Sequence, residues 1–278
     1  MRGVGLTDPA EFRDRAGPLL MADELRHTVQ LAVLAQIERG GRFAEHHLWV
    51  VEDGDRAVAC AMMTPPFNVL VAGDDGDALV ELVATVRGDG VAVPGVTGFL
   101  PEAREFATRW VEATGADARP VMSMRMYATS AVTPVPPADG AMRVAGESDR
   151  ALLTEWSHAF ARETGLREGP AEIARSVDSR VGADPGIVVW ESGGAPVTLA
   201  GATVSSPGIA RVGPVYTPPE HRRHGYATSL VAAWTTELLR RGVRRSVLFT
   251  DLANPTSNSI YQAVGYEPIA DAAMIDFG

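Results

Sequence analysis

The sequence predicts an α/β protein that contains two related units in tandem. Its 278 residues are many for one domain and sufficient for two, each able to bury its own core. The order strand–strand–helix–strand–helix is expected twice, on either side of Tyr127–Gly140, a segment rich in proline and small residues. This repetition indicates duplication of one α/β unit, with domains at residues 1–129 and 141–278 and a linker at residues 130–140.

The first half begins its pattern with a hairpin. His47–Pro66 predicts two strands joined by a turn at Asp53–Asp55, which has glycine at its centre. A helix is expected over Ala78–Arg87, and a β-branched strand follows it. The next helix is expected to start at Pro101, because proline at the first turn of a helix removes a backbone donor that has no partner there.

The second half repeats the pattern at greater length. Ile187–Pro207 predicts a strand, a glycine turn and a second strand, and Ile209–Thr217 is mostly apolar, which indicates a buried strand in a mixed sheet. Pro214 lacks an amide proton, so it is expected to interrupt the pairing of this strand or to lie at a bulge. The elements expected after it are a helix at Thr228–Arg241, a strand at Ser246–Leu252 and a helix from Pro255.

The composition argues against several classes of function. The net charge of -10 disfavours sequence-independent binding of nucleic acid, which needs a basic face. No apolar run approaches the length of a membrane span, and the start of the sequence lacks the hydrophobic segment of a secretion signal. Cys60 is the single cysteine, so no internal disulfide is possible and a cytoplasmic location is expected. The apolar run around Cys60 favours a core position over a nucleophile.

The histidines do not predict a metal site. His46 and His47 are adjacent and point apart on a strand. His221 and His224 have ligand-like spacing, yet they lie among arginines that would repel a cation. Neither pair has cysteine partners, so no metal is expected.

The segment after Pro214 predicts an anion site. An interrupted strand leaves backbone groups of Val215, Tyr216 and Thr217 available to bind another molecule. The first turn of a helix offers unpaired amides and the positive end of a dipole, and a glycine lets an anion approach the backbone. Arginine adds a fixed charge that binds phosphate oxygens in pairs. The expected pyrophosphate site consists of Arg222, Arg223, His224, Gly225, Tyr226, Ala227 and Thr228.

A solvated surface loop is the alternative, because R-x-x-G-x-A alone is a loosely specified motif. The loop is not a P-loop, which needs G-K-[ST], and it lacks the dinucleotide fingerprint G-x-G-x-x-G. At the corresponding helix start, the first half has three aspartates, Asp74, Asp75 and Asp77. Carboxylates there would suit the helix dipole but would repel a phosphate, so only the second half is expected to bind an anion.

Two motifs of the second half resemble those of a known superfamily. The loop V-Y-T-x-P-E-x-R-x-x-G-x-A is followed by T-D-L-x-N-P-x-S-N-x-x-Y-x-x-x-G-Y. In this order and separation they resemble the GNAT superfamily of acetyl-CoA-dependent N-acyltransferases over Ile187–Asp276. The first half resembles the degenerate N-terminal repeat of two-domain members. The resemblance implies two tandem GNAT-like domains, each a mixed, mostly antiparallel sheet flanked by helices, with acetyl-CoA as cosubstrate. Arg223 departs from the pattern, since glycine is frequent at its position.

The resemblance also implies roles for the cofactor-binding residues. Backbone groups of Val215, Tyr216 and Thr217 would receive the acyl carbonyl and the pantetheine chain, and the loop would hold the pyrophosphate through its amides. Asn254, at the end of a strand, would bond the pantetheine amides, and Asn258 on the next helix would assist.

The resemblance implies one catalytic acid. Tyr261 lies one helical turn past Asn258, on the same face of the helix. In the superfamily a tyrosine at this point protonates the leaving thiolate, which requires that its hydroxyl reach the sulfur. The alternative for Tyr261 is a core aromatic residue packed on the sheet.

The general base is less evident. An ammonium must lose a proton before it attacks a thioester. Many members of the superfamily place a glutamate on the strand before the bulge, where this chain has Thr203 and Ser205. The helix Thr154–Gly165 and the loop after it would form the acceptor wall and offer Glu155, His158, Glu163 and Glu168. Glu163 is the predicted catalytic base, and a solvated carboxylate is its alternative.

The expected function is transfer of an acetyl group from acetyl-CoA to a primary amine of a small molecule or peptide, by direct attack. Two alternatives stay open, a non-catalytic acyl-CoA-binding sensor or partner protein, and a transferase for a longer acyl group. No nucleic-acid or membrane partner is expected. A homodimer stays open as well, because exposed strand edges in such folds often pair.

Overall fold

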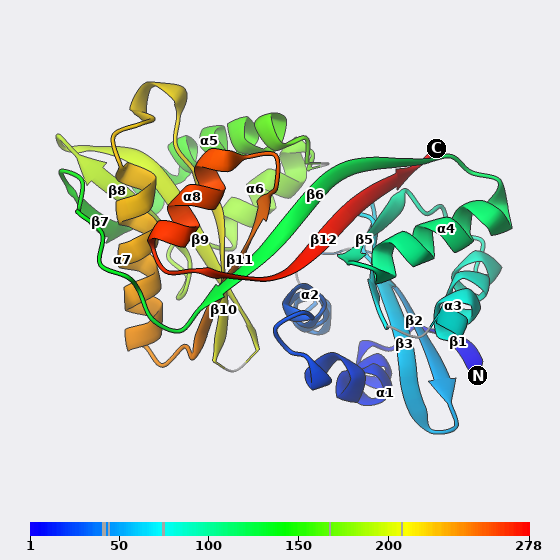
Figure 1. Ribbon diagram of the computed structural model, residues 1–278. Helices are drawn as coiled ribbons and strands as arrows, with labels where there is room; N and C mark the ends of the chain where they lie inside the picture. Colours follow the sequence, from blue (N-terminus) through cyan, green and yellow to red (C-terminus); the bar gives the residue numbers. More distant parts are fainter. Residues whose placement is uncertain (41–42, 44, 74–75, 167, 207) are drawn as a thin grey trace. The chain divides into compact units, whose positions relative to one another are not determined.

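The computed structural model describes residues 1–40, 43, 45–73, 76–166, 168–206 and 208–278. It confirms the predicted α/β class, with mixed, mostly antiparallel sheets flanked by helices (Figure 1). The chain forms two compact units. Unit 1 comprises Met1–Arg125, Asp251–Ala253 and Ala270–Gly278, and unit 2 comprises Met126–Thr250 and Asn254–Ile269.

Unit 1 is a sheet in the order β1-β2-β3-β4-β5-β12, with helices on both faces (Figure 1). Its neighbouring strands are antiparallel except for β4 and β5, which are parallel. Alternation along β2 explains the two faces, because Trp49 and Val51 pack with α3 and α4, whereas Leu48 and Val50 pack with α1 and α2. The elements are β1 (Arg2–Leu6), α1 (Pro9–Ala22), α2 (Thr28–Glu38), β2 (His47–Asp53), β3 (Arg56–Met63), β4 (Val69–Ala72), α3 (Gly76–Gly88), β5 (Gly95–Phe99), α4 (Glu102–Thr114), and the unit 1 parts of β6 (Ala118–Thr129) and β12 (Glu267–Phe277).

Unit 2 is a sheet in the order β6-β11-β10-β9-β8-β7. The strands β7 to β10 pair antiparallel, and β10 and β11 are parallel. Val189 and Leu199 pack with α5 and α6, whereas Val188 and Ala200 pack with α7 on the other face (Figure 1). The elements are β7 (Ala141–Val144), the short helix η1 (Glu147–Asp149), α5 (Arg150–Thr164), α6 (Pro170–Asp178), β8 (Ile187–Ser192), β9 (Ala195–Ser206), β10 (Ile209–Tyr216), the short helix η2 (Pro219–His221), α7 (Tyr226–Arg240), β11 (Arg245–Asp251) and α8 (Pro255–Ala263).

The last strand of the chain belongs to unit 1. Residues Ala272–Asp276 of β12 pair antiparallel with Gly95–Phe99 of β5, and Ala273 and Ile275 lie in the same core as α3 and α4. The sequence predicts one domain over residues 141–278, whereas this pairing places the end of the chain with the first half. Adjacent elements in the sequence are the usual neighbours in space, so a pairing across this separation is not readable from the pattern.

The predicted linker is packed against unit 2. Val132 and Val135 contact a core cluster that includes Tyr127 and Tyr266. The backbone amide of Ala138 donates to Ser229 Oγ at 2.7 Å. This segment is therefore fixed along unit 2 up to the start of α7.

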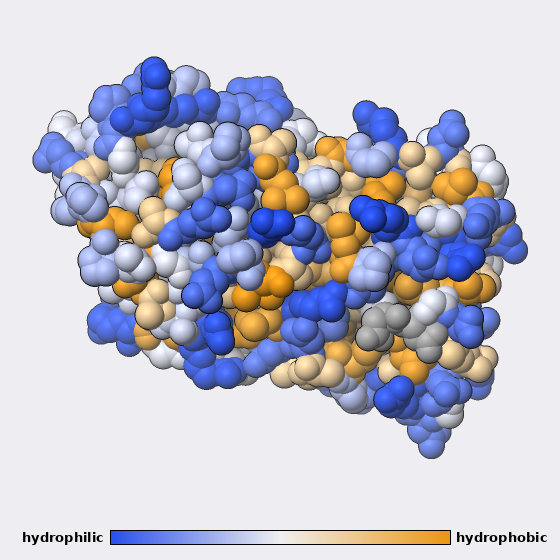
Figure 2. All heavy atoms as spheres, in the orientation of Figure 1, coloured by the Kyte–Doolittle hydropathy of each residue, from blue (hydrophilic) through white to orange (hydrophobic). Residues whose placement is uncertain are grey.

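Polar and charged residues cover much of the face drawn in Figure 2, as the net charge of -10 leads one to expect. Large apolar side chains that are exposed include Val80 and Val144. Within the described part of the chain, no helix is both long and apolar enough to cross a membrane.

The single thiol provides a stability prediction for unit 1. Cys60 on β3 is buried in the core beneath α1, and this burial raises its pKa from 9.0 to about 12. Between these values the unfolded chain releases a proton that the folded chain keeps. The free energy of unfolding should therefore fall with rising pH, by up to about 1.4 kcal/mol per pH unit.

Urea unfolding between pH 8 and pH 10, followed in the wild type and in Cys60→Ala, measures this dependence. The substitution should lower the stability at every pH because it leaves a small cavity, and it should flatten the decline above pH 9. Equal slopes for the two proteins would contradict the assignment.

Candidate functional site

The β10 strand contains the interruption predicted at Pro214. Val212 pairs with Ala202 of β9, but Val215 pairs with Ala200, so β10 has one extra residue in this interval. Gly213 adopts φ +148 at the shift. In the described part of the sheet, the parallel pairing of β10 with β11 ends at Arg211 and Val247. The bulge therefore lies where β10 and β11 are no longer paired, and its backbone can face a ligand on that side.

The loop after the bulge leads directly into α7. Gly225 adopts φ +78 at the start of this helix, and no side chain caps it. Ser229 N donates to Gly225 O, which leaves the amides of the first turn, from Tyr226 to Thr228, without an acceptor further back along the helix. A Cβ placed on Gly225 would meet only Ala138 Cβ, at 3.8 Å. This turn has the open amides and the room that a pyrophosphate needs.

Arg223 occupies a backbone conformation that favours glycine. Its φ is +65, and it is the one non-glycine residue with positive φ among the described residues. For an L-residue this conformation costs about 1 kcal/mol, because Cβ approaches the carbonyl oxygen. Arg223 therefore stands in a turn whose backbone conformation favours glycine.

We expect Arg223→Gly to raise the free energy of unfolding of unit 2 by about 0.5–1 kcal/mol relative to Arg223→Ala. Both variants remove the charge, so only the relief at positive φ distinguishes them. Urea denaturation of the two variants measures the difference. A glycine variant no more stable than the alanine variant would show that the turn is not strained.

Glu163, the predicted base, is held in a cluster with Arg222 and Tyr216. Arg222 Nη2 lies 2.7 Å from Glu163 Oε2, and the Tyr216 hydroxyl donates to Glu163 Oε1 at 3.0 Å. Arg222 Nε also donates to Thr217 O at 2.9 Å. Burial raises the pKa of the Tyr216 hydroxyl, and its bond to Glu163 adds to the increase. The cluster joins the end of α5 to the end of β10 and to the loop, so the Arg222 side chain points to protein groups here.

The backbone carbonyl of Tyr216, at the end of β10, is bonded within the protein. Thr198 Oγ1 donates to Tyr216 O at 2.8 Å, and Thr217 Oγ1 donates to Thr198 Oγ1 at 2.8 Å. The Val215 side chain packs against the core cluster that contains Tyr261. Of the three residues predicted to bind the acyl and pantetheine groups, Val215 therefore connects the bulge to α8.

The two predicted asparagines stabilise the start of α8. Asn254 Oδ1 accepts from Ser257 N at 3.0 Å as the N-cap, and Asn254 O accepts from Asn258 Nδ2 at 2.7 Å. Asn258 Oδ1 accepts from the hydroxyl of Tyr127 at 3.0 Å. Both side chains thus hold the helix end in place, in addition to any bond they make to a ligand.

Tyr261 lies beside the bulge but within the core. Its side chain is 8% exposed, and its ring meets Tyr266 edge-on at 6.2 Å. Burial is the main cause of a raised pKa of its hydroxyl, with a smaller contribution from Tyr266. At neutral pH the phenol is protonated, which is the form that an acid requires.

The other candidates for the base are dispersed over α5 and its surroundings. Glu155 is exposed and His158 is half-buried on α5, and Glu168 is half-buried in the loop after it. Thr203 is half-buried on β9, and the side chain of Ser205 lies outside the described residues. The described part of the chain brings no second carboxylate into the cluster of Glu163 and Arg222.

Arg180 contacts the bulge and was not among the residues predicted from the sequence. It follows α6, and its Nη2 donates to Gly213 O at 2.9 Å and to Thr203 Oγ1 at 3.1 Å. Gly201 lies beneath the guanidinium, since a Cβ there would come within 3.1 Å of Nη1. Glycines at strand positions signal close approach of other groups, and Gly201 and Gly213 were the available signals.

Unit 1 has a different start to the corresponding helix. Asp77 lies in the first turn of α3, in keeping with an acidic helix start. Asp74 and Asp75 lie outside the described residues. Among the residues described, no group of three His, Cys, Asp or Glu side chains is placed to hold a metal ion.

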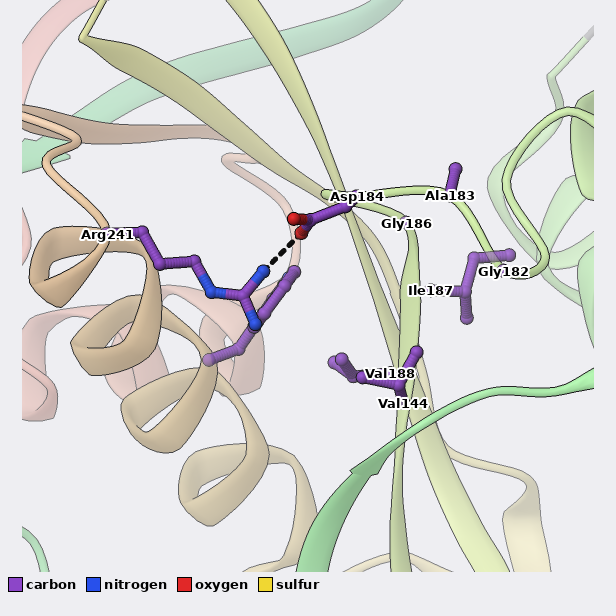
Figure 3. Close-up of a pocket in the computed structure, with 9 residues that line it drawn as sticks. Val144, Gly182, Ala183, Asp184, Gly186, Ile187, Val188 and Arg241 are labelled. Atoms are coloured by element: carbon purple, nitrogen blue, oxygen red, sulfur yellow. Dashed lines mark hydrogen bonds and ion pairs between the residues drawn. The ribbon is translucent and has the colours of Figure 1, made fainter.

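A pocket of about 200 Å³ lies away from these residues, between β8 and the C-terminal half of α7. Figure 3 shows Arg241 pointing to Asp184 across it, joined by an ion pair. Val144 and Val188 line its apolar side, together with Trp234 of α7. None of the predicted site residues lines this pocket.

Comparisons with known proteins agree with this geometry. The FR47-like protein family matches residues 190–274, which include the bulge, the loop and α8. No curated protein sequence matches the chain significantly. Among solved structures, a Drosophila protein superposes with a TM-score of 0.72 at 12% identity, covering 99% of this chain and 98% of the other.

Two further structures have informative names. A GCN5-related N-acetyltransferase from Sphaerobacter thermophilus has a TM-score of 0.65 at 18% identity, covering 99% of this chain and 95% of the other. A tandem GNAT protein from the clavulanic acid biosynthesis pathway has a TM-score of 0.57 at 16% identity, covering 100% and 98%. At these identities the structures show the fold, and they confirm the tandem GNAT architecture that the resemblance implied.

Proposed function

Because this chain has the tandem GNAT fold and matches the FR47-like family over residues 190–274 of its second unit, we propose that it is an N-acetyltransferase. Acetyl-CoA is the proposed donor, and the acceptor is a primary amine of a small molecule or peptide. The observation that supports this most is the bulge in β10 next to the open first turn of α7. A thioester beside the bulge and a pyrophosphate at the turn would fit one extended ligand.

The proposed chemistry is direct attack. The neutral amine forms a C–N bond with the thioester carbon, the C–S bond breaks, the nitrogen gives up one proton to a base, and the leaving thiolate takes up one proton. Backbone groups at the bulge would stabilise the negative charge that develops on the carbonyl oxygen. Tyr261 would supply the proton to sulfur, since its phenol is protonated and its cluster includes Val215 of the bulge.

The role of Glu163 follows from its contacts. Both oxygens of Glu163 already have partners, since Arg222 Nη2 bonds Oε1 and Oε2 and the Tyr216 hydroxyl donates to Oε1. Glu163 would act as the base only if Arg222 moved to the pyrophosphate and left the carboxylate to the acceptor. Binding of phosphate by Arg222 and the action of Glu163 as a base therefore both require that Arg222 move away from Glu163.

One observation favours the second candidate, a protein that binds acyl-CoA without turnover. Both catalytic candidates are engaged, Tyr261 in the core and Glu163 with Arg222. Replacing Tyr261 by Phe separates the two functions. A loss of turnover with unchanged affinity for CoA would support catalysis, and equal turnover would remove Tyr261 from the mechanism.

Binding of the donor is tested by a charge at the start of α7. Thr228→Glu places a carboxylate in the first turn, where it suits the helix dipole and preserves stability but repels a pyrophosphate. The matched control is Thr236→Glu, an exposed position two turns further along the same helix. Thermal unfolding is then recorded with acetyl-CoA, CoA and longer acyl-CoAs.

The unfolding temperature of the wild type and of Thr236→Glu should rise with the concentration of acetyl-CoA, and that of Thr228→Glu should stay constant. A stronger shift with longer acyl-CoAs would favour the transferase for a longer acyl group. An unchanged shift in Thr228→Glu would place the ligand elsewhere. No shift with any CoA species in the wild type would end the proposal.

A further inference from the structure

A cation site lies where α5 meets the end of β10, and it is formed by Glu163, Tyr216 and Thr217. Arg222 occupies it in this structure. The Nη2 of this arginine lies 2.7 Å from Glu163 Oε2 and 3.0 Å from Oε1, and its Nε donates to Thr217 O at 2.9 Å. Its Cζ lies over the ring of Tyr216, 5.9 Å from the centre. A carboxylate, a carbonyl oxygen and an aromatic face are the partners that a guanidinium prefers.

Unit 2 holds the groups of this cation site in place without help from the arginine. The Tyr216 hydroxyl donates to Glu163 Oε1 at 3.0 Å, and Trp156 packs against the Tyr216 ring with 6.5 Å between the ring centres. The Thr217 hydroxyl donates to Thr198 Oγ1 at 2.8 Å. Because these contacts do not involve the guanidinium, the site is preorganised for another cation and loses little freedom when it binds one.

Arg222 is a weakly held occupant of the cation site. Its side chain is 43% exposed and that of Glu163 is 45% exposed, and ion pairs as exposed as this one contribute little to stability. Arg222 also belongs to the loop that leads to Gly225 and the open first turn of α7, which is the proposed pyrophosphate site. A pyrophosphate has more negative charge than one carboxylate and binds a guanidinium through paired hydrogen bonds. Binding of acetyl-CoA would therefore draw Arg222 away from Glu163 and vacate the cation site.

The cation site adjoins the proposed reaction centre. Val215 ends the bulge interval of β10, and Tyr216 follows it directly. The Tyr216 side chain packs with α5 and α6, on the side where the acceptor wall is predicted. The net charge of -10 also favours the approach of cationic molecules. A cationic group bound here would lie on the acceptor side, close to a thioester at the bulge.

We propose that the cation site binds a guanidinium of the acceptor once acetyl-CoA has displaced Arg222, so that the substrate class is primary amines that also have a guanidinium. This inference rests on the proposed acetyltransferase function and names the acceptor class of the same site. Glu163 determines specificity by holding the guanidinium while the amine nitrogen faces the thioester. The bonds that form and break are those given above, and the amine proton passes to water instead of Glu163.

The first experiment tests the cation site by binding alone. Arg222→Ala vacates the site, and thermal unfolding is recorded with agmatine, which has one primary amine and one guanidinium. Arg162→Ala is the matched control, because Arg162 is an exposed arginine next to Glu163 in α5. Agmatine should raise the unfolding temperature of Arg222→Ala but not that of the wild type or Arg162→Ala. The double variant Arg222→Ala, Glu163→Gln should not respond.

The wild type should respond to agmatine when CoA is also present, because the pyrophosphate then holds Arg222. A wild type that responds to agmatine without CoA as strongly as Arg222→Ala does would place the ligand elsewhere. No response of Arg222→Ala would overturn the inference.

The second experiment compares acceptors that differ only in charge, by release of the CoA thiol from acetyl-CoA. Agmatine is compared with 4-aminobutylurea, and glycyl-argininamide with glycyl-citrullinamide, so that a uniform preference for one pair distinguishes a small-molecule acceptor from a peptide. The wild type and Arg162→Ala should prefer the guanidinium over the urea by about 5- to 10-fold in kcat/KM, the effect of one partly exposed charge pair with a cation–π contact. Glu163→Gln should abolish this preference. A general base at Glu163 would instead lower the rates with both acceptors and leave their ratio unchanged.

Failure of the inference and failure of the proposed function give different results. Equal rates with guanidinium and urea in the wild type, or a preference that survives in Glu163→Gln, would overturn the cation site and leave the acetyltransferase in place. A wild type whose unfolding temperature rises with acetyl-CoA, but which acetylates no amine, would overturn the acceptor class and catalysis together.

Discussion

Removal of the last nine residues, Ala270–Gly278, should unfold unit 1. The deleted segment pairs with β5 over Ala272–Asp276 and contributes Ala273 and Ile275 to the core beneath α3 and α4. Phe277 stacks on Trp110 at 5.6 Å. Burying one large apolar side chain contributes about 1.5–3 kcal/mol, so the loss is comparable to the whole stability of a typical domain.

The expected result is loss of the near-ultraviolet circular dichroism of unit 1 and rapid proteolysis before residue 126. A point variant provides the control for chain length. Ile275→Asp buries a charge in the core and should reproduce the deletion, whereas Met274→Asp, on the alternate face of the strand, should cost less. A truncated chain that keeps the circular dichroism of unit 1 would contradict this role of β12.

The contribution of β12 to unit 1 illustrates what the sequence alone does not determine. Residues 272–276 have an apolar pattern that is common to buried strands, and nothing in this pattern identifies β5 as the partner. Local signals, in contrast, act within a few residues. The hairpin at Gly54 and the bulge at Pro214 were predictable because they depend on glycine and proline backbone preferences. The helix predicted from Thr228 begins two residues earlier, at Tyr226, directly after Gly225.

The candidate site also contains features that the sequence predicts and contacts that it does not. The order of two motifs was sufficient to place the bulge, the loop and α8, which are close in the sequence. The contacts of Glu163 were not predictable, because its partners Tyr216 and Arg222 lie more than 50 residues away and depend on how α5 is rotated against the sheet. Arg180 lies in a turn, where the sequence has no helix or strand periodicity. The only sequence signal for its position is the glycine on the strand that it packs against, Gly201.

The second large effect is expected at a buried ion pair of unit 1. Arg26 and Glu102 form an ion pair, and their side chains are 29% and 8% exposed. Arg26 also lies over the ring of Phe99, at 5.0 Å from its centre. Among the described residues, Arg26 Nε and Glu102 Oε2 are buried without a hydrogen-bond partner. The pair is therefore incompletely satisfied, and each member depends on the other for compensation of its charge.

Arg26→Ala should destabilise unit 1 by about 3–5 kcal/mol, because it leaves the carboxylate of Glu102 buried and uncompensated. Glu102→Ala should cost less, since Arg26 is the more exposed member and can reach water with its charged end. The double variant Arg26→Met, Glu102→Met replaces both charges by apolar groups and should be more stable than Arg26→Ala alone.

Urea unfolding of the three variants and the wild type tests this coupling, because the order of their four free energies of unfolding differs between a buried and a solvated pair. Two partners that are merely solvated would give small, additive losses of less than about 1 kcal/mol. A buried pair gives losses that do not add, because the second substitution removes the charge that the first one left uncompensated. A double variant no more stable than Arg26→Ala would place the effect in lost packing on Phe99 instead.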